Sequence, residues 1–309
     1  MHKGDEDLKD KRFAHFLALI IMLVWGMSYL SIKIVVSEID PTVSAFYRFF
    51  IAAIILFIVL KVKFPQEKVL KEDRLRMALG GLFGVALYFF FENYSVFFTS
   101  ASNVAILIST IPIFTLFSQR IIFKEKLTLY KVIGATLSVI GIIIIIASKE
   151  RISLFSTGTL GDLMALGAAL CWVVYNVVTS KFKGNYKSIT ITTYQAIWGC
   201  IFLSPSLLFY KATIPSRNAV LNLLFLSVFC SCIAYAIYIY CLPKLGATVL
   251  TTYINLQPIV SLISAKLLLH EDVTIYQVIG SLIIILGVYI VSFGEKLKIN
   301  KWIYSKLSI

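Results

Sequence analysis

The segment at residues 101–146 recurs at residues 247–292, and this internal repeat constrains the fold more than any other feature of the chain. The two segments agree at five distinctive positions, which pair Pro112 with Pro258, Glu125 with Glu271, Tyr130 with Tyr276, Gly134 with Gly280 and Gly141 with Gly287. Apolar sequences match one another mainly at Leu and Ile, so composition alone does not explain these matches. Repeats within a chain of many apolar helices are typical of transporter architecture. We therefore expect two copies of one unit.

Hydrophobic residues dominate the sequence in runs long enough to cross a membrane. Of the 309 residues, 59% are hydrophobic and 15% are charged, and the mean hydropathy is +0.88. Soluble domains of this size carry far less apolar sequence. Backbone groups in lipid find no water, so apolar runs of about 20 residues are expected to form spanning helices. Ten such runs are present, at residues 13–36, 41–61, 75–98, 101–123, 128–147, 160–181, 188–210, 218–240, 245–268 and 274–293.

The positive charge of the chain is distributed as a topology signal. A charged segment at residues 1–12 precedes a first apolar run that is longer than the apolar part of a signal peptide, so this run is expected to remain as the first helix. With the N-terminus inside, the cytoplasmic segments hold 21 Lys and Arg residues and the outside loops hold five. This asymmetry predicts a plasma-membrane protein with both termini in the cytoplasm. It also explains the net charge of +13 without nucleic-acid binding.

Five helices in each unit is an odd number, so the second unit has to enter the membrane from the opposite side. The loop charges agree with this inversion. The loop after the fourth run carries Arg120, Lys124 and Lys126, whereas its counterpart after the ninth run has only Lys266 and His270. Matching segments thus exchange charge as an inverted repeat requires. The predicted fold class is an all-α polytopic membrane protein with ten transmembrane helices, arranged as two inverted five-helix repeats around a central cavity.

The domain organisation follows from the repeat. We expect a first five-helix repeat at residues 13–147 and a second at residues 160–293, joined by a short outer loop. The tail at residues 294–309 is basic and is expected to lie along the inner membrane surface, attracted by anionic lipid. The last run of each repeat has two glycines seven residues apart on one helical face, which predicts close helix packing.

Several short motifs within this pattern carry a resemblance to a known family. In the first half they are Trp25-Gly26, Tyr47-Arg48-Phe49, the segment 99–103, Pro112, the segment 124–128 and Gly134, and in the second half they are the segments 245–247 and 270–274, with Pro258 and Gly280. In these motifs the chain resembles the drug/metabolite transporter superfamily, in particular the EamA-type ten-helix exporters, over about 280 residues. The resemblance implies a basket of ten helices around a central cavity, with the fifth and tenth helices at the periphery. It leaves the substrate open among amino acids, other metabolites and, in distant branches, nucleotide sugars.

Three charged side chains fall inside the predicted helices, where charge is costly and therefore suggests function. They are Lys33, Arg48 and Glu92, and all three lie in the outer half of the membrane. The structural alternatives are that Lys33 extends outward to the interface and that Arg48 only supports a helix start. Glu92 is the hardest to explain structurally, because a short carboxylate does not reach far.

Polar and aromatic residues at helical spacing predict a lined cavity. For a single Ser or Thr, a hydrogen bond between helices is the simpler explanation. Trp25 and Trp172, however, match each other in the repeat and lie about twelve residues from either helix end, too deep for interfacial anchors. The candidate substrate-binding residues are Trp25, Tyr29, Lys33, Arg48, Tyr88, Glu92, Asn103, Trp172, Tyr175, Asn176, Tyr235, Tyr238 and Asn255.

Other functional classes lack their motifs. The sequence has no G-x-x-x-x-G-K-[ST] loop for nucleotide phosphates and no H-E-x-x-H zinc motif. Its five cysteines all lie in or beside apolar runs and are expected to be free thiols. No nucleophile–base pair stands out, so we expect neither an enzyme nor a resident cofactor or metal.

The combined expectation is a secondary transporter that exports small metabolites, with amino acids or related zwitterions as the expected substrate class, by alternating access. Lys33 and Arg48 would attract a carboxylate, and Glu92 would bind an amine or carry a proton. The alternatives are a membrane sensor that binds without transport, uptake instead of export, and a carrier of another substrate class such as nucleotide sugars. The expected partners are the lipid bilayer, a small metabolite and possible coupling protons; the oligomeric state stays open.

Overall fold

The computed structural model describes residues 2–147, 157–210, 214–269 and 274–307, and these residues form helices without any strand. The chain is a polytopic all-α membrane protein, as its sequence predicts. Within the described residues, five helical stretches are by themselves long and apolar enough to cross a membrane, namely Lys9–Val36, Pro41–Lys63, Lys71–Phe98, Gly158–Thr179 and Arg217–Leu245.

The helices follow the ten predicted runs in order. The first repeat contains α1 (His2–Val36), α2 (Pro41–Lys63), the short η1 (Lys71–Asp73), α3 (Arg74–Gly81) continued by η2 (Leu82–Leu87) and α4 (Tyr88–Phe98), then α5 (Ala101–Ile108), α6 (Ile111–Ile122) and α7 (Leu129–Ala147). The second repeat contains α8 (Thr157–Thr179), α9 (Ser188–Leu203) with η3 (Ser204–Leu208), α10 (Arg217–Phe225) continued by η4 (Leu226–Ile233) and α11 (Ala234–Leu245), then α12 (Ala247–Thr252), η5 (Tyr253–Leu256), α13 (Gln257–Leu269) and α14 (Ile275–Leu307).

The fourth and ninth predicted helices are interrupted rather than continuous. The run at 101–123 divides into α5 and α6, and the run at 245–268 divides into α12, η5 and α13. In both cases a proline, Pro112 or Pro258, is the second residue of the later helix. Proline has no N–H and its ring crowds the preceding turn, so the backbone hydrogen-bond ladder stops there. The third and eighth helices also share an irregularity, because each contains a π-helical segment, η2 or η4.

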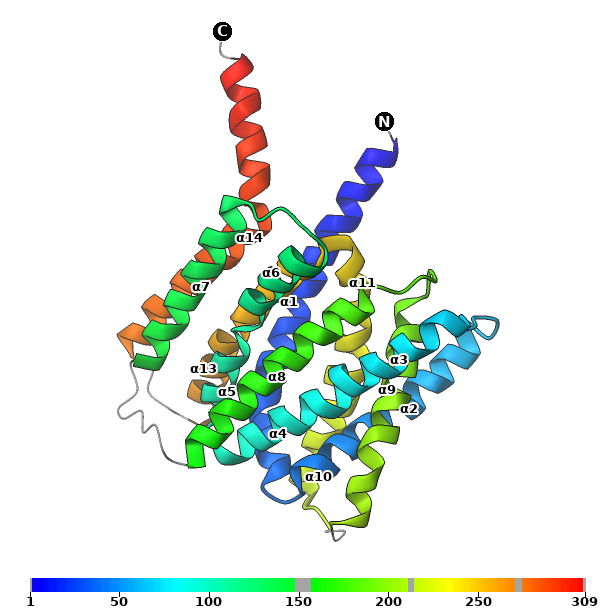
Figure 1. The fold of residues 1–309 in the computed structure, drawn as a ribbon. Coiled ribbons are helices and arrows are strands. Elements are labelled where there is room, and N and C mark those ends of the chain that lie inside the picture. Colours follow the sequence, from blue (N-terminus) through cyan, green and yellow to red (C-terminus); the bar gives the residue numbers. More distant parts are fainter. Residues whose placement is uncertain (1, 148–156, 211–213, 270–273, 308–309) are drawn as a thin grey trace.

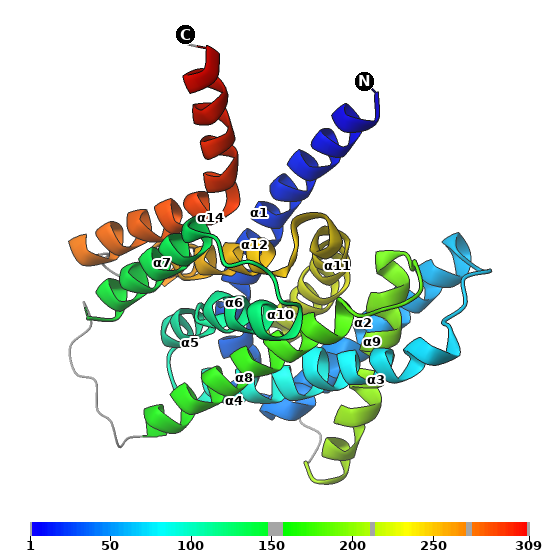
Figure 2. The ribbon, with the colours of Figure 1, turned by 45° about the horizontal axis from the view of Figure 1, so that its top comes forward.

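The last helices of the two repeats, α7 and α14, lie side by side at one edge of the molecule (Figures 1 and 2). A Cβ atom added to Gly134 would lie 2.6 Å from the carbonyl oxygen of Gly287, and one added to Gly141 would lie 2.6 Å from that of Gly280. Only glycine allows the two backbones to approach this closely. The predicted close-packing role of these glycines is confirmed.

Both termini lie at the same end of the molecule, which we call the terminal end; the opposite end is the far end (Figure 1). In the basic tail, α14 continues as a helix to Leu307 and its last turns project away from the bundle (Figure 2). Similarly, α1 begins at His2, well before the apolar run starts at residue 13. The long extension of α14 has a local reason, because no proline interrupts this helix after its apolar part. Contact of the basic tail with the inner membrane surface stays a prediction.

Polar contacts join the two repeats at both ends. At the terminal end, the buried carboxylate of Asp73 accepts hydrogen bonds from the backbone N–H groups of Lys183 and Gly184 and from the hydroxyl of Tyr186, at 2.9–3.1 Å. At the far end, the exposed Glu38 accepts hydrogen bonds from the backbone N–H and the hydroxyl of Ser216, at 2.6 and 2.7 Å. These contacts hold loops of opposite repeats together beyond the helix bundle.

Candidate functional site

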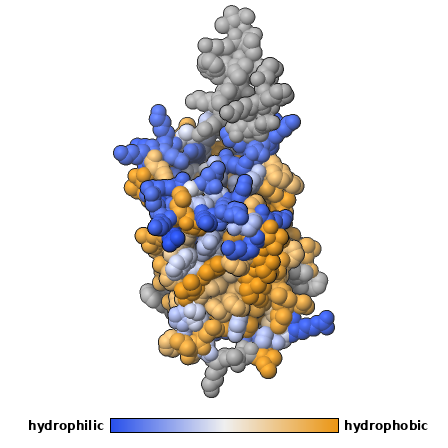
Figure 3. Space-filling view, turned by 90° about the vertical axis from the view of Figure 1, so that its right-hand side faces the viewer, coloured by the Kyte–Doolittle hydropathy of each residue, from blue (hydrophilic) through white to orange (hydrophobic). Residues whose placement is uncertain are grey.

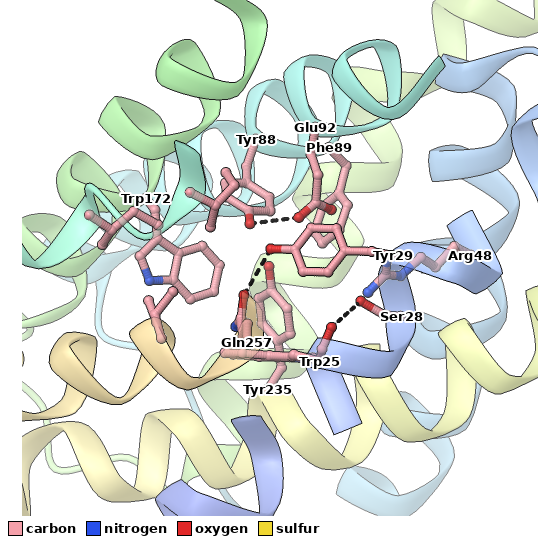
Figure 4. Close-up of a pocket in the computed structure, with 13 residues that line it drawn as sticks. Trp25, Ser28, Tyr29, Arg48, Tyr88, Phe89, Glu92, Trp172, Tyr235 and Gln257 are labelled. Atoms are coloured by element: carbon pink, nitrogen blue, oxygen red, sulfur yellow. Dashed lines mark hydrogen bonds between the residues drawn. The ribbon is translucent and has the colours of Figure 1, made fainter. Parts of the chain in front are cut away.

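A small pocket lies where the two repeats meet, and helices from both of them line it (Figure 4). Its walls come from α1, α2, α4, the break between α5 and α6, α8, α11 and the break between η5 and α13. The lining residues are Trp25, Ser28, Tyr29, Arg48, Tyr88, Phe89, Glu92, Ile108, Ile111, Trp172, Tyr235, Ile254 and Gln257.

Eight of these residues form four pairs at matching positions of the two repeats. The pairs are Trp25 with Trp172, Phe89 with Tyr235, Ile108 with Ile254 and Ile111 with Gln257. A pocket lined by matching residues of inverted repeats lies on the axis that relates them. Two of the pairs stand at the breaks before Pro112 and Pro258, and interrupted helices commonly build binding sites in such folds.

The remaining five lining residues all belong to the first repeat. They are Ser28, Tyr29, Arg48, Tyr88 and Glu92, and each carries a polar group. The pocket therefore has a polar side formed mainly by the first repeat, which supplies both charged residues, whereas the second repeat adds the amide of Gln257.

Glu92 presents its carboxylate on this polar side. The residue is 4% exposed, and its Oε1 accepts a hydrogen bond from the hydroxyl of Tyr88 at 2.8 Å. Tyr88 is one turn earlier on the same helix, α4, so the spacing of four residues creates the contact directly. A buried carboxylate with a single neutral donor retains capacity to accept further hydrogen bonds.

Arg48, on α2, lies on the same polar side of the pocket as this carboxylate (Figure 4). It is 3% exposed, and its Nε donates a hydrogen bond to the hydroxyl of Ser231 at 2.7 Å. Its guanidinium carbon stands 4.2 Å from the ring centre of Phe89, which is a cation–π distance. Nη1 is buried and has no hydrogen-bond partner among the described residues. Buried donors are nearly always paired, so this unpaired donor suits an anionic ligand.

The hydroxyl of Tyr29 links the polar side to the interrupted ninth helix. It donates a hydrogen bond to Oε1 of Gln257 at 2.8 Å, and Gln257 is the first residue of α13. The bond connects α1 of the first repeat to α13 of the second directly beside the pocket (Figure 4).

Aromatic rings fill most of the space between the walls. The ring centres of Trp25 and Trp172 are 5.5 Å apart at a right angle, and Tyr235 lies 5.6 Å from each of them. Tyr88 stands 4.9 Å from Trp172. The remaining cavity volume is about 20 Å³, enough for about one water molecule. The structure therefore shows the site contracted around its own side chains.

The candidate residues from the sequence fall into distinct groups. Seven line the pocket, namely Trp25, Tyr29, Arg48, Tyr88, Glu92, Trp172 and Tyr235. Three others lie outside the lining: Trp172 donates a hydrogen bond to Tyr238, which donates one to Asn176, and Tyr175 donates separately to Gln195. Asn255 is buried beside the break in the ninth helix, with Oδ1 unpaired among the described side chains. The side chain of Asn103 lies outside the described part of the structure.

Lys33 is placed away from the pocket. Its ammonium group donates to the carbonyl oxygens of Val96 and Thr99 at 2.7 and 3.0 Å, at the end of α4. The last carbonyls of a helix have no partner within it and attract a cation. Lys33 thus stabilises the C-terminal end of α4, and the three helix charges do not all meet at one cavity.

Sequence reasoning did not select six of the lining residues, namely Ser28, Phe89, Ile108, Ile111, Ile254 and Gln257. The internal repeat could have identified five of them. Phe89 matches the selected Tyr235, and the other four are matching residues just before the prolines of the interrupted helices. Ser28 gives no such signal, since it is one of many small polar residues in apolar helices.

Other sites find little support in the described residues. All five cysteines are free thiols. In the described part of the chain, no group of three or more His, Cys, Asp and Glu side chains is arranged to hold a metal ion.

Comparisons with known proteins agree with this architecture. The model of the EamA-like transporter family matches residues 12–147 and again residues 159–293. The chain is 33% identical over 280 residues to an uncharacterized transporter from Archaeoglobus fulgidus, covering 89% of this chain and 96% of that protein.

More distant relatives carry more specific names. Proteins named probable amino-acid metabolite efflux pump, from Salmonella typhimurium and Escherichia coli, are each 24% identical and cover 92% and 90% of this chain and 96% and 94% of their own lengths. A solved crystal structure superposes with a TM-score of 0.72 over 92% of this chain and 97% of that chain at 16% identity, a likeness of fold alone.

Proposed function

Because the chain belongs to the EamA-like transporter family, we propose that it exports small zwitterionic metabolites, amino acids or their close relatives, across the plasma membrane. The lysine and arginine distribution supports an orientation with both termini, and therefore the terminal end, in the cytoplasm. The names of the relatives point to transporters and not to enzymes, and two of them point to amino-acid metabolites.

The observation that carries the proposal is the polar side of the central pocket. Arg48 offers an unpaired buried donor, and Glu92 offers a carboxylate with spare acceptor capacity. A zwitterion places its carboxylate near the first and its ammonium group near the second, so that each buried charge gains a partner.

Alternating access follows from the contraction of the site. A cavity of about 20 Å³ does not hold an amino acid. Ligand entry therefore requires the rings of Trp25, Trp172 and Tyr235 to separate. Since these rings come from opposite repeats, movement of one repeat against the other opens the pocket. The loop contacts of Asp73 and Glu38 at the two ends would have to loosen in turn.

Glu92 has two roles open to it. It binds the substrate amine directly, or it carries a proton that is exchanged during each cycle. In the second case, Glu92→Gln would transport at a rate that no longer depends on pH, whereas in the first it would lose affinity for the zwitterion at every pH.

The proposal is tested by flux of a labelled amino-acid mixture from proteoliposomes that contain the purified protein. We expect export by the wild type, and in Glu92→Gln either weaker export at every pH or export at a rate that no longer depends on pH. Glu125→Gln is the matched control, because it removes a carboxylate of the same kind from an exposed loop outside the pocket. Flux unchanged in Glu92→Gln would contradict the role of the polar side.

A membrane sensor is the alternative to a transporter, and the same preparation separates the two. A sensor would bind amino acids in an equilibrium binding assay without moving them across the bilayer. Binding without flux in the wild type would therefore replace the proposed function, whereas flux that requires Glu92 supports it.

A further inference from the structure

A second and larger cavity opens at the terminal end, away from the central pocket. Its volume is about 640 Å³, within the range of about 300–1,000 Å³ typical of ligand sites. The end of α2, the segment that joins α8 to α9, and the end of α11 form its walls. The lining residues are Val59, Lys63, Phe64, Thr179, Ser180, Phe182, Gly184, Asn185, Tyr186, Lys187, Ser188, Ile189, Ile191, Ile239, Tyr240, Leu242, Pro243 and Lys244.

Three lysines and no acidic residue stand among these described lining residues. The ammonium groups of Lys63 and Lys187 form no hydrogen bond or ion pair within the described part of the chain. The third lysine, Lys244, is paired with the exposed Asp10 and lies over the ring of Tyr240, 4.5 Å from its centre. The carboxylates of Glu67 and Asp73 accept hydrogen bonds from the backbone N–H groups of Lys187 and Gly184 without lining the cavity, so the ammonium groups of Lys63 and Lys187 are its charged groups without an ion-pair partner in the described residues.

Neutral hydrogen-bond donors lie in the cavity wall together with the lysines. The cavity wall includes the hydroxyl groups of Thr179, Ser180 and Ser188 and the amide of Asn185. Ammonium and hydroxyl groups around one cavity are the usual surroundings of a phosphate group, since each phosphate oxygen accepts several hydrogen bonds.

The rest of the wall is apolar. Val59, Ile189, Ile239 and Leu242 belong to the membrane-spanning helices and border the same cavity. Viewed from the side of α2 and α9, hydrophilic side chains gather toward the terminal end and a hydrophobic surface occupies the part below (Figure 3). The cavity thus stands at the level where lipid head groups meet the hydrocarbon region of the bilayer.

From this arrangement we propose that the cavity binds the phosphate group of an anionic phospholipid, with Lys63 and Lys187 as its principal cationic contacts. The lysines and hydroxyl groups hold the head group, and the apolar wall below them accommodates the start of an acyl chain. Basic pockets between the ends of membrane helices favour anionic head groups in this way. A soluble phosphate compound shares the charge but gains nothing from the apolar wall.

Such a lipid would connect the two repeats. Lys63 belongs to α2 of the first repeat, whereas Lys187 precedes α9 of the second. Their joint contact with one phosphate group would hold these helix ends together at the terminal end, next to the contacts of Asp73. The binding does not depend on which substrate the central pocket accepts.

The test measures binding of dioleoyl phosphatidylglycerol to the intact protein in detergent, by native mass spectrometry and by the rise in Tm. The variant Lys63→Gln/Lys187→Gln is expected to bind about 25-fold more weakly, at roughly fivefold for each lysine removed. Lys63→Arg/Lys187→Arg keeps both charges and should restore most of the affinity.

The control variant is Lys61→Gln/Lys181→Gln. It removes two lysines from the same two segments, but neither lines the cavity, and their ammonium groups lie over the rings of Phe57 and Phe123. Its lipid affinity should stay within about twofold of the wild type, because both lysines of the cavity remain. Its net charge equals that of the test variant, so a difference between the two variants does not come from net charge.

Two outcomes would overturn the proposal. The first is equal loss of lipid in the test and control variants, which would indicate general attraction to a basic end of the protein. The second is stabilisation by inorganic phosphate equal to that by the phospholipid, or by zwitterionic phosphatidylcholine equal to that by phosphatidylglycerol. Because both variants are also assayed for amino-acid flux, failure of the lipid site remains distinguishable from failure of the transport proposal.

Discussion

The two repeats build the same walls of the central pocket but contribute different chemistry to it. Matching residues such as Trp25 and Trp172 stand on opposite sides of one cavity. Arg48 and Glu92, in contrast, match Gln195 and Tyr238 of the second repeat, and neither of those two lines the pocket. Positions at which the repeats match therefore determine where the pocket lies. Positions at which they differ supply its two charged side chains.

The matching residues Arg48 and Gln195 also differ in their hydrogen bonds. Gln195 accepts a hydrogen bond from Tyr175 and donates one to Thr179, so it is paired within its own repeat. Arg48 bonds across to Ser231 of the other repeat and keeps one donor free. Neutral groups that pair internally strengthen a scaffold, whereas a charged group with an unpaired donor is available for a ligand.

The largest effect is expected from removing charge on the polar side. Arg48→Gln should lower the transport efficiency for a zwitterion by roughly 10- to 100-fold, because a hydrogen bond to a charged group contributes about 1.5–3 kcal/mol. The measurement is initial flux against substrate concentration in proteoliposomes. Tyr238→Phe alters the other repeat and should change flux by less than about fivefold; equal losses in both variants would remove the functional asymmetry.

A medium effect is expected where the repeats are alike. Gly141→Ala and Gly287→Ala change matching positions, and each introduces a Cβ atom 2.6 Å from a carbonyl oxygen of the facing helix, that of Gly280 or Gly134. Overpacking of this kind costs about 1–3 kcal/mol, so both variants should lower Tm by a similar amount. Thermal unfolding in detergent measures this. A clear drop in Tm for only one variant would show that the glycine contacts between α7 and α14 do not contribute equally to stability.

The smallest effect concerns the far-end contact of Glu38. The backbone N–H and then the hydroxyl of Ser216 donate to this carboxylate and hold its pKa below the usual value. A lowered pKa adds stability that is present above the pKa of the unfolded chain and is lost as the pH falls through the folded value. Glu38→Gln should therefore remove a small part of the drop in Tm between neutral and acidic pH. An identical pH profile would show that the contact adds no stability.

Local pattern was sufficient for the fold and for much of the site. Apolar run length predicted the helices, because lipid leaves the backbone no partner except itself. The glycine spacing predicted the α7–α14 packing. Seven of the thirteen pocket residues were selected as candidates, since Trp, Tyr, Arg and Glu deep in a membrane helix are costly to place without purpose.

The sequence did not predict in which direction a side chain points or which helix breaks come together. Lys33 lies at a depth similar to that of Arg48, but its long side chain turns to the carbonyls of Val96 and Thr99 on a neighbouring helix. Ile108 and Ile254 line the pocket because two interrupted helices bring their breaks together, although isoleucine alone gives no sign of a site.

The sequence by itself determined the ten apolar helices, the doubled unit and the presence of costly polar groups, because each of these depends on local composition and spacing. Only the tertiary structure decided that the walls pair across the repeat axis, that Arg48 and Glu92 share one pocket while Lys33 does not, and that aromatic rings contract that pocket to about 20 Å³. The physical reason is that these features depend on how helices far apart in the chain rotate and pack against one another, and spacing along a single helix does not encode that rotation.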